Sequence, residues 1–156
     1  MRSSAGEAAL AIPALLYRYA DAIDSGRFAE AAALFEHASL LVEGRRIQGA
    51  AAMEAMWQRW VRIYEDGTPR TRHLISNPCI ELDADLKGAS CRSQWTLLQK
   101  AGAALPLQLL ATGRHHDRFA YIDGHWRFTE RCYAGIDLAG DLSAHLLLPP
   151  EGGKGN

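Results

Sequence analysis

The chain has 156 residues, and 48% of them are hydrophobic, which is the size and composition of one domain with a sizeable core. Its formal net charge of -1 gives no reason to expect nucleic acid or an anionic membrane as a partner. No apolar run approaches the ~20 residues that a membrane-spanning helix needs. We therefore expect a single domain over residues 1–148 and a disordered tail over 149–156, where proline and glycine are frequent.

The sequence also indicates a compartment. Residues 1–6 are small and polar, and charge and helical periodicity follow, so the N-terminus lacks the pattern of a secretory signal. Cys79, Cys91 and Cys132 are an odd number at wide spacing, and they form neither a zinc motif nor a disulfide framework. We expect a cytoplasmic protein with reduced thiols and no cofactor.

The first 64 residues predict three helices and one short strand. The first helix has an apolar face made of Ile12, Leu15, Leu16, Tyr19 and Ile23, and Ser25-Gly26 ends it. The expected helices cover residues 7–24, 27–35 and 50–64, and the expected strand covers 39–43.

The rest of the chain changes to a period of two, which is typical of strands. Asp123-Gly124 signals a hairpin turn, and Pro78 indicates a bulge in the first long strand. Alternation sends His115 and Asp117 to the same face of the third long strand. Helices followed by an antiparallel meander predict an α+β fold, with helices packed on one face of a curved sheet that encloses a pocket. The four long strands are expected at 70–83, 88–100, 105–121 and 125–138.

Asp24 and His73 are the first candidates for catalysis. Asp24 ends the first helix, where the helix dipole disfavours an anion, and His73 begins the first long strand. If the two meet, the carboxylate would fix the imidazole tautomer and stabilise the imidazolium that forms when the ring takes a proton. The alternative is a buried pair that only pins the helix to the sheet. Adding His115 would give a ligand set that suits zinc, but no short ligand spacing supports it, and we expect no metal.

Three segments carry a resemblance to a known family. They are Tyr-Arg-Tyr-Ala-Asp-Ala-Ile-Asp-Ser at 17–25, Arg-Thr-Arg-His-Leu-Ile-Ser-Asn at 70–77 and Asp-Gly-His-Trp-Arg-Phe at 123–128. Over residues 12–145 the chain resembles the nuclear-transport-factor-2-like (NTF2-like) superfamily, and within it the SnoaL-like group that includes scytalone dehydratase. The resemblance implies a cone-shaped α+β barrel with three N-terminal helices on a mainly antiparallel sheet.

The resemblance places Asp24 and His73 at the dehydratase carboxylate and histidine. The same positions are similar to the Asp–His base of hexachlorocyclohexane dehydrochlorinase and to a pair in a bile-acid dehydratase. The sequence departs from scytalone dehydratase at other pocket positions. Ile23 stands where a tyrosine is expected, and Gly113 and His115 stand where a serine and an asparagine are expected. The resemblance therefore implies the same base with a different substrate.

Two further polar residues would enter the pocket by this resemblance. His115 would act there as a second general acid, or it is a strand histidine bonded to the backbone. Arg131 would anchor a carboxylate or enolate oxygen. Alternatively, Arg131 forms a salt bridge with Asp21, Asp24 or Glu130.

Four other residues complete the expected substrate-binding set. Tyr133 shares the face of Arg131 and could donate to the same oxygen, while Asn77 lies on His73's side of its strand. Tyr19 lies on the apolar stripe and either places its hydroxyl in the cavity or serves only the core. Trp57 supplies an apolar wall or belongs to the core stripe of the third helix.

The favoured hypothesis is a cofactor-independent lyase or isomerase that removes a proton from a small hydrophobic, cyclic hydroxylated or carbonyl metabolite. A second hypothesis comes from the segment at 70–77, which also resembles the non-catalytic small β subunit of ring-hydroxylating dioxygenases. A third is a ligand-binding module without turnover. The resemblance also implies a homodimer or homotrimer.

Overall fold

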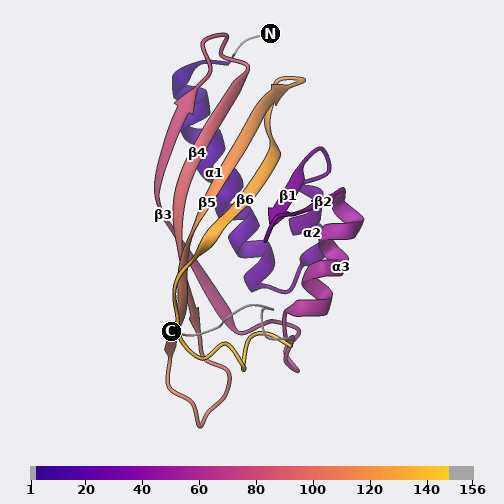
Figure 1. Cartoon of the computed structure of the whole chain (residues 1–156), viewed down its shortest axis with the longest axis vertical. Coiled ribbons are helices and arrows are strands. Elements are labelled where there is room, and N and C mark those ends of the chain that lie inside the picture. The colour runs from indigo at the N-terminus through magenta and orange to yellow at the C-terminus, as the bar shows by residue number, and fades with distance from the viewer. Residues whose placement is uncertain (1–2, 148–156) are drawn as a thin grey trace.

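The structure is a computed structural model that describes residues 3–147. The tail expected at 149–156 lies outside the described residues. Figure 1 labels the elements along the chain. They are α1 (Ala5–Asp24), α2 (Phe28–Ala33), β1 (Ser39–Val42), β2 (Arg45–Gln48), α3 (Ala50–Trp60), β3 (Thr71–Leu82), β4 (Gly88–Gln99), β5 (Gln108–Ile122) and β6 (His125–Ala139).

The strands form one six-stranded sheet in the order β2-β1-β6-β5-β4-β3. All neighbours are antiparallel except β1 and β6, which run parallel. Helix α1 lies along the long strands, and α2 and α3 lie beside β1 and β2 (Figure 1). The expected α+β fold, with three helices on a curved and mainly antiparallel sheet, is confirmed. No helix in the described part of the chain is both long and apolar enough to cross a bilayer.

The two turn features predicted for the long strands are present. Asp123 and Gly124 have φ angles of 50° and 79°, as a tight two-residue hairpin between β5 and β6 requires. The pairing of β3 with β4 shifts register between Ser76 and Cys79, which is the bulge expected at Pro78.

The largest differences from the prediction are an additional strand and the end of a helix. Strand β2 is four residues long and mostly polar, so it lacks the hydrophobic alternation that would have predicted it. The turn before it has φ angles of 48° at Glu43 and 76° at Gly44. Helix α3 ends at Trp60 instead of residue 64, because Val61 is extended and pairs with Leu146 near the end of the described chain.

The core lies between the three helices and the inner face of the sheet. Its largest fully buried apolar members include Ile12, Leu16, Phe35, Leu40, Met53, Phe119 and Phe128. Buried residues recur at helical spacing along α1, and buried residues alternate with more exposed ones along β5 and β6. The apolar side of the helix and the apolar face of the sheet therefore pack into one layer.

A charged pair is buried in this layer. Arg131 on β6 lies directly opposite Asp117 on β5, and its Nε and Nη2 each donate to a carboxylate oxygen at 2.8 Å. Both side chains are 0% exposed. The guanidinium carbon lies 4.3 Å from the ring centroid of Tyr19 and 5.0 Å from that of Phe128. Burial opposes the charge of Arg131, but Asp117 outweighs that effect and the pKa of Arg131 is raised.

The expected partners of Arg131 were therefore wrong. Asp21 pairs with Arg27 and Glu130 pairs with Arg46, both at the surface. Asp117 is the partner of Arg131 because the register of β5 and β6 places the two residues directly opposite each other on the inward face.

Removing one member of this pair should be costly. Asp117→Asn leaves a buried guanidinium without its anion, and we expect it to lower the free energy of unfolding by about 3–5 kcal/mol. The exposed pair of Arg114 and Asp137, also between β5 and β6, is the matched control. Asp137→Asn should cost at most about 1 kcal/mol. Urea unfolding of both variants measures this, and equal losses would contradict the role assigned to the buried pair.

Candidate active site

The end of α1 places Asp24 against β3. Gly26 follows the helix with a φ of 71°, and a side chain there would collide with the carbonyl oxygen of Gly67. Only glycine suits both the left-handed conformation and this close approach. The chain therefore turns at once after the helix, and the carboxylate of Asp24 is buried beside the first residues of β3.

Three groups of β3 bind this carboxylate. His73 Nδ1 lies 2.7 Å from Asp24 Oδ1, and the hydroxyl of Thr71 donates to the same oxygen at 2.7 Å. The backbone N–H of His73 donates to Oδ2, also at 2.7 Å. The side chain of Asp24 is 5% exposed and that of His73 is 12% exposed. The two residues singled out from the sequence therefore meet at hydrogen-bond distance.

The surroundings of Asp24 hold it as an anion. Burial alone would raise its pKa, but the hydrogen bonds and charge of His73, together with the hydroxyl of Thr71, lower it below the usual value. An anionic partner makes Nδ1 of His73 the protonated nitrogen. No hydrogen bond within residues 3–147 uses the other nitrogen, Nε2. The pair thus presents a ring nitrogen with a free lone pair, which is what a general base requires.

Two tyrosines lie next to the dyad. The hydroxyls of Tyr19 on α1 and Tyr133 on β6 are 2.8 Å apart. The centroid of the Tyr19 ring is 4.3 Å from the guanidinium carbon of Arg131 and 6.4 Å from the centroid of the His73 ring. Burial, followed by the nearby Tyr133, raises the pKa of Tyr19 well above its usual value. Tyr19 is therefore a neutral hydroxyl that can donate a hydrogen bond.

His115 is a neighbour of both tyrosines. Its ring centroid is 4.9 Å from Tyr133 and 6.0 Å from Trp95. Burial first, and then the charges of Arg131 and His73, lower the pKa of His115 well below its usual value. Within residues 3–147 its Nδ1 has no hydrogen-bond partner. His115 is thus a neutral imidazole, which is a poor general acid but a suitable hydrogen-bonding group.

The other two predicted residues do not join the dyad. Asn77 is exposed, has a φ of 52° and donates to the side chain of Gln94 at 3.1 Å. Alternation from His73 predicted an inward side chain, but the bulge begins at Asn77 and breaks the alternation. Trp57 packs on Tyr19 and Phe35, with centroids 5.9 and 6.1 Å away, so it supports the site from behind.

One histidine near the dyad was missed by the sequence analysis. His145 is buried on the segment after β6, and its backbone carbonyl accepts from the N–H of Arg62 at 2.8 Å. Burial, followed by the charge of His73, lowers the pKa of His145 to about 4. This segment has no strand or helix periodicity, so only its long-range contacts with the end of α3 identify it.

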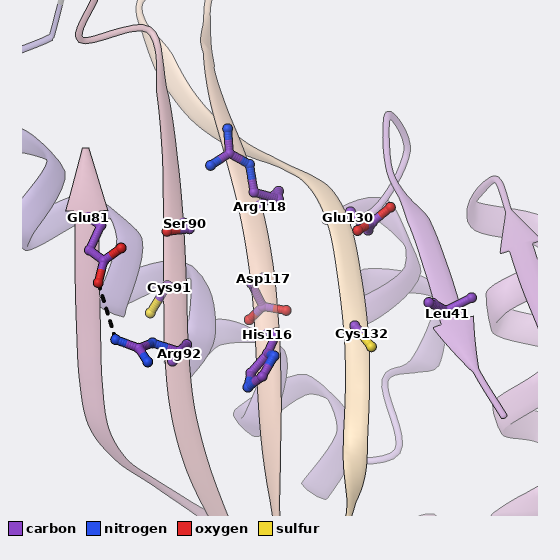
Figure 2. A pocket seen from close by; sticks show the side chains of 10 residues that line it. All are labelled: Leu41, Glu81, Ser90, Cys91, Arg92, His116, Asp117, Arg118, Glu130 and Cys132. Atoms are coloured by element: carbon purple, nitrogen blue, oxygen red, sulfur yellow. Dashed lines mark hydrogen bonds and ion pairs between the residues drawn. The ribbon is translucent and has the colours of Figure 1, made fainter. Parts of the chain in front are cut away.

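Open grooves mark the surface of the described part of the chain. One of about 540 Å³ lies over β4, β5 and β6, and Figure 2 shows Arg92, His116 and Arg118 along it, with Glu81 paired to Arg92. Another, of about 490 Å³, is lined by Asp24, Thr71 and neighbouring polar residues. Neither is lined by Arg131 or Tyr133, so neither is the enclosed pocket expected from the sequence. Within residues 3–147 no set of three His, Cys, Asp or Glu side chains is arranged to hold a metal ion.

Comparison with known families identifies the class of protein. Residues 5–132 match the family described as SnoaL-like domain, and the chain belongs to this family. The resemblance to the NTF2-like superfamily found in the sequence is thereby confirmed. A comparison with curated protein sequences found no significant match.

Solved structures share the fold. An Asp-to-Asn variant of a Mycobacterium tuberculosis protein of unknown function is 28% identical, with a TM-score of 0.65 over 81% of this chain and 69% of that one. A Novosphingobium aromaticivorans protein provisionally named a scytalone dehydratase is 23% identical, with a TM-score of 0.65 over 84% and 85%. The β subunit of a provisionally named aromatic-ring-hydroxylating dioxygenase from the same organism is 16% identical, with a TM-score of 0.64 over 83% and 89%.

His145 should make stability depend on pH. The unfolded chain binds a proton on this residue below pH ~6.5, whereas the folded chain does so only near pH 4, so stability falls as the pH drops between these values. His145→Phe keeps the ring and removes the titration. When the pH is lowered from 7.5 to 5, the free energy of unfolding of His145→Phe should fall by about 2 kcal/mol less than that of the wild type.

The measurement is urea unfolding at the two pH values. His125 is an exposed histidine on β6, and His125→Phe is the matched control, which should retain the pH dependence of the wild type. The assignment is wrong if His145→Phe retains it as well.

Proposed function

We propose that this SnoaL-like protein is a cofactor-independent lyase or isomerase. Its substrate would be a cyclic, largely apolar hydroxylated or carbonyl metabolite. The observation that carries the proposal is the contact of 2.7 Å between Asp24 and the Nδ1 of a His73 whose Nε2 is free to accept a proton. Family membership supports a small-molecule ligand, and the fold is shared with a protein provisionally named a scytalone dehydratase.

The proposed reaction begins with proton transfer from carbon to His73. Nε2 takes the proton from a carbon next to an activating carbonyl group, and the electrons of the C–H bond move toward the carbonyl oxygen. Asp24 stabilises the resulting imidazolium and is itself fixed by Thr71 and the backbone of His73. In an elimination, a hydroxyl group on the next carbon then leaves as water after accepting a proton from the imidazolium.

The negative charge that develops on the substrate oxygen would need hydrogen-bond donors to stabilise it. The hydroxyls of Tyr19 and Tyr133 are the nearest candidates, because they bond to each other beside the dyad. Arg131 would act through Tyr19, whose ring it contacts, since its own guanidinium is already paired with Asp117. A role of Arg131 in directly anchoring a substrate carboxylate does not fit this pairing.

A second candidate is a ligand-binding protein without turnover. Family membership favours a small-molecule ligand and does not by itself require a reaction. The likeness to a dioxygenase β subunit concerns the fold alone, so no residue of the candidate site supports the hypothesis of a non-catalytic subunit. A homodimer or homotrimer and a cytoplasmic location remain predictions.

The test uses 3-hydroxy-1-tetralone, a bicyclic β-hydroxy ketone that loses water to give fluorescent 1-naphthol. We expect the wild type to accelerate this dehydration. His73→Ala should lower the rate by at least about 100-fold, because a positioned acid–base group contributes about 10²- to 10⁴-fold. Asp24→Asn should also lower it strongly, because the neutral amide neither fixes the tautomer nor stabilises the imidazolium.

His116 provides the control for these variants, because it is exposed on the outer face of β5. His116→Ala should dehydrate the probe at the wild-type rate. Rates for His73→Ala within tenfold of the wild type would refute the general-base assignment. Binding of cyclic ketones without turnover in the wild type would favour the binding protein instead.

A further inference from the structure

A second groove lies at the start of β3, which is an edge strand of the sheet. Its volume of about 490 Å³ is that of a small-ligand site. Asp24 and Thr71 line this groove. The proposed base and its neighbouring donors, which are His73, Tyr19 and Tyr133, do not line it. The groove is therefore a place for a ligand apart from the proposed reaction, and we call it the edge groove.

A hydrogen-bond acceptor without a partner lines the edge groove. Gln99 on β4 is 2% exposed and lies directly opposite Thr71 on β3. Its Nε2 donates to the backbone carbonyl oxygens of Pro69 at 2.9 Å and Ala144 at 3.3 Å. Because carbonyl oxygens only accept hydrogen bonds, the nitrogen must be on that side of the amide and Oε1 on the other. Within residues 3–147 Oε1 has no hydrogen-bond partner, which is costly for a buried group, so it calls for a donor.

Two cations of the edge groove have no carboxylate partner. Arg72 and Lys100 line the groove and are exposed. Within the described residues the side chain of each donates only to a backbone carbonyl oxygen, and neither forms a salt bridge. In contrast, Arg70 in the same groove is paired with Asp66 at 2.9 Å. Two positive charges thus stand against the single carboxylate of Asp24, and this excess favours a ligand that carries a negative charge.

Apolar side chains complete the edge groove. Leu98 precedes Gln99 on β4 and lies opposite Arg72 on β3. Leu107, which is 64% exposed, also lines the groove. A hydrocarbon chain bound there would remove part of this apolar surface from water, which is favourable. Together these features describe a ligand with an anionic end, a hydrogen-bond donor and a short apolar chain.

We propose that the edge groove binds a small hydroxycarboxylate. Arg72 and Lys100 hold its carboxylate, and its hydroxyl donates to Gln99 Oε1. Its carbon chain packs on Leu98 and Leu107. The inference does not rest on the proposed function, because binding here involves neither the proposed base nor turnover.

The charges of the groove favour a hydroxyl over an ammonium group as the donor. An ammonium group would suit the Oε1 of Gln99, but it would bring a third positive charge beside Arg72 and Lys100. It would also lose more hydration than a hydroxyl on reaching a buried acceptor. A hydroxyl donates the same hydrogen bond without a charge. A hydroxycarboxylate therefore leaves fewer unbalanced charges in the groove than an amino carboxylate does.

The experiment compares five probes with the same six-carbon acyl chain. They are 3-hydroxyhexanoate, 6-hydroxyhexanoate, hexanoate, 6-aminohexanoate and methyl 3-hydroxyhexanoate. Each is titrated into the full chain by isothermal titration calorimetry at low and at moderate ionic strength. The two hydroxyl positions test two separations between hydroxyl and carboxylate. Hexanoate lacks the donor, the amine replaces it with a cation, and the methyl ester lacks the negative charge.

We expect at least one hydroxyhexanoate to bind about 2- to 10-fold more tightly than hexanoate, which is the range for one neutral hydrogen bond. Salt should weaken the binding of the acids but not that of the methyl ester. Arg72→Gln and Lys100→Gln should each weaken the hydroxy acid about 2- to 5-fold, as for an exposed ion pair. Arg45→Gln changes an exposed arginine of β2 outside the groove, and this matched control should change nothing.

Two further variants locate the ligand. Gln99→Met should remove the preference for the hydroxyl and leave the affinity for hexanoate unchanged. Gln99 also bonds two loop carbonyls, so this variant can lose stability; Arg72→Gln and Lys100→Gln change exposed side chains and test the site without that risk. Tyr133→Phe alters the candidate active site and should leave every affinity unchanged.

Several results would overturn the inference. One is a failure of both hydroxyhexanoates to bind. Another is binding of hexanoate, 6-aminohexanoate or the methyl ester that is as tight as that of the hydroxy acids. A third is an Arg45→Gln variant that weakens binding as much as Arg72→Gln does. A loss of affinity in Tyr133→Phe would also overturn it, because the ligand would then lie beside the dyad.

Discussion

The carboxylate of Asp24 is the point on which both the fold and the site depend. It ends α1, and it accepts hydrogen bonds from the hydroxyl of Thr71, the backbone of His73 and the ring of His73. These bonds join the helix to the edge strand of the sheet and offset the cost of burying an anion at a helix C-terminus. The same bonds set the orientation and tautomer of the imidazole. Stability and chemistry therefore cannot be separated at this residue, and activity measurements on Asp24 variants need a parallel measurement of folding.

The buried charges are arranged as two separate pairs, and the ring of Tyr19 is a neighbour of both Arg131 and His73. Asp24 pairs with His73, and Asp117 pairs with Arg131. Each potential cation thus has its own anion, and the interior carries little net charge although it holds several titratable groups. His115 and His145 lie near these cations without an anion of their own, and burial together with those charges keeps both rings neutral. In the proposed reaction, a site with neutral imidazoles, a neutral Tyr19 and one anchored base would transfer a proton without first burying a net charge.

The sequence predicted what local periodicity and turn chemistry determine. The apolar stripe of α1, the alternation in the long strands, the Asp123-Gly124 turn and the bulge at Pro78 all depend on residues close in the chain. The errors depend on distant contacts. Asp117 is the partner of Arg131 because of register, α3 ends where Val61 meets Leu146, and His145 is buried by a segment without periodicity. Asn77 shows a further limit, because predicting a bulge does not reveal which residue it turns outward.

Membership of the SnoaL-like family accounts for the scaffold, and the neighbours of the dyad account for what it can act on. Gly113 stands where the resemblance to scytalone dehydratase implies a pocket serine, and the indole of Trp95 occupies the space that a side chain at Gly113 would need. This packing brings an unpaired indole N–H to the side of the site that already holds His115. Relative to that resemblance, a hydroxyl donor is absent at Gly113 and an indole donor lies nearby, while Asp24 and His73 match the dehydratase positions. In the proposed reaction the base would require only a proton next to an activating group, so the hydrogen-bond donors beside it would decide which substrate oxygen is activated.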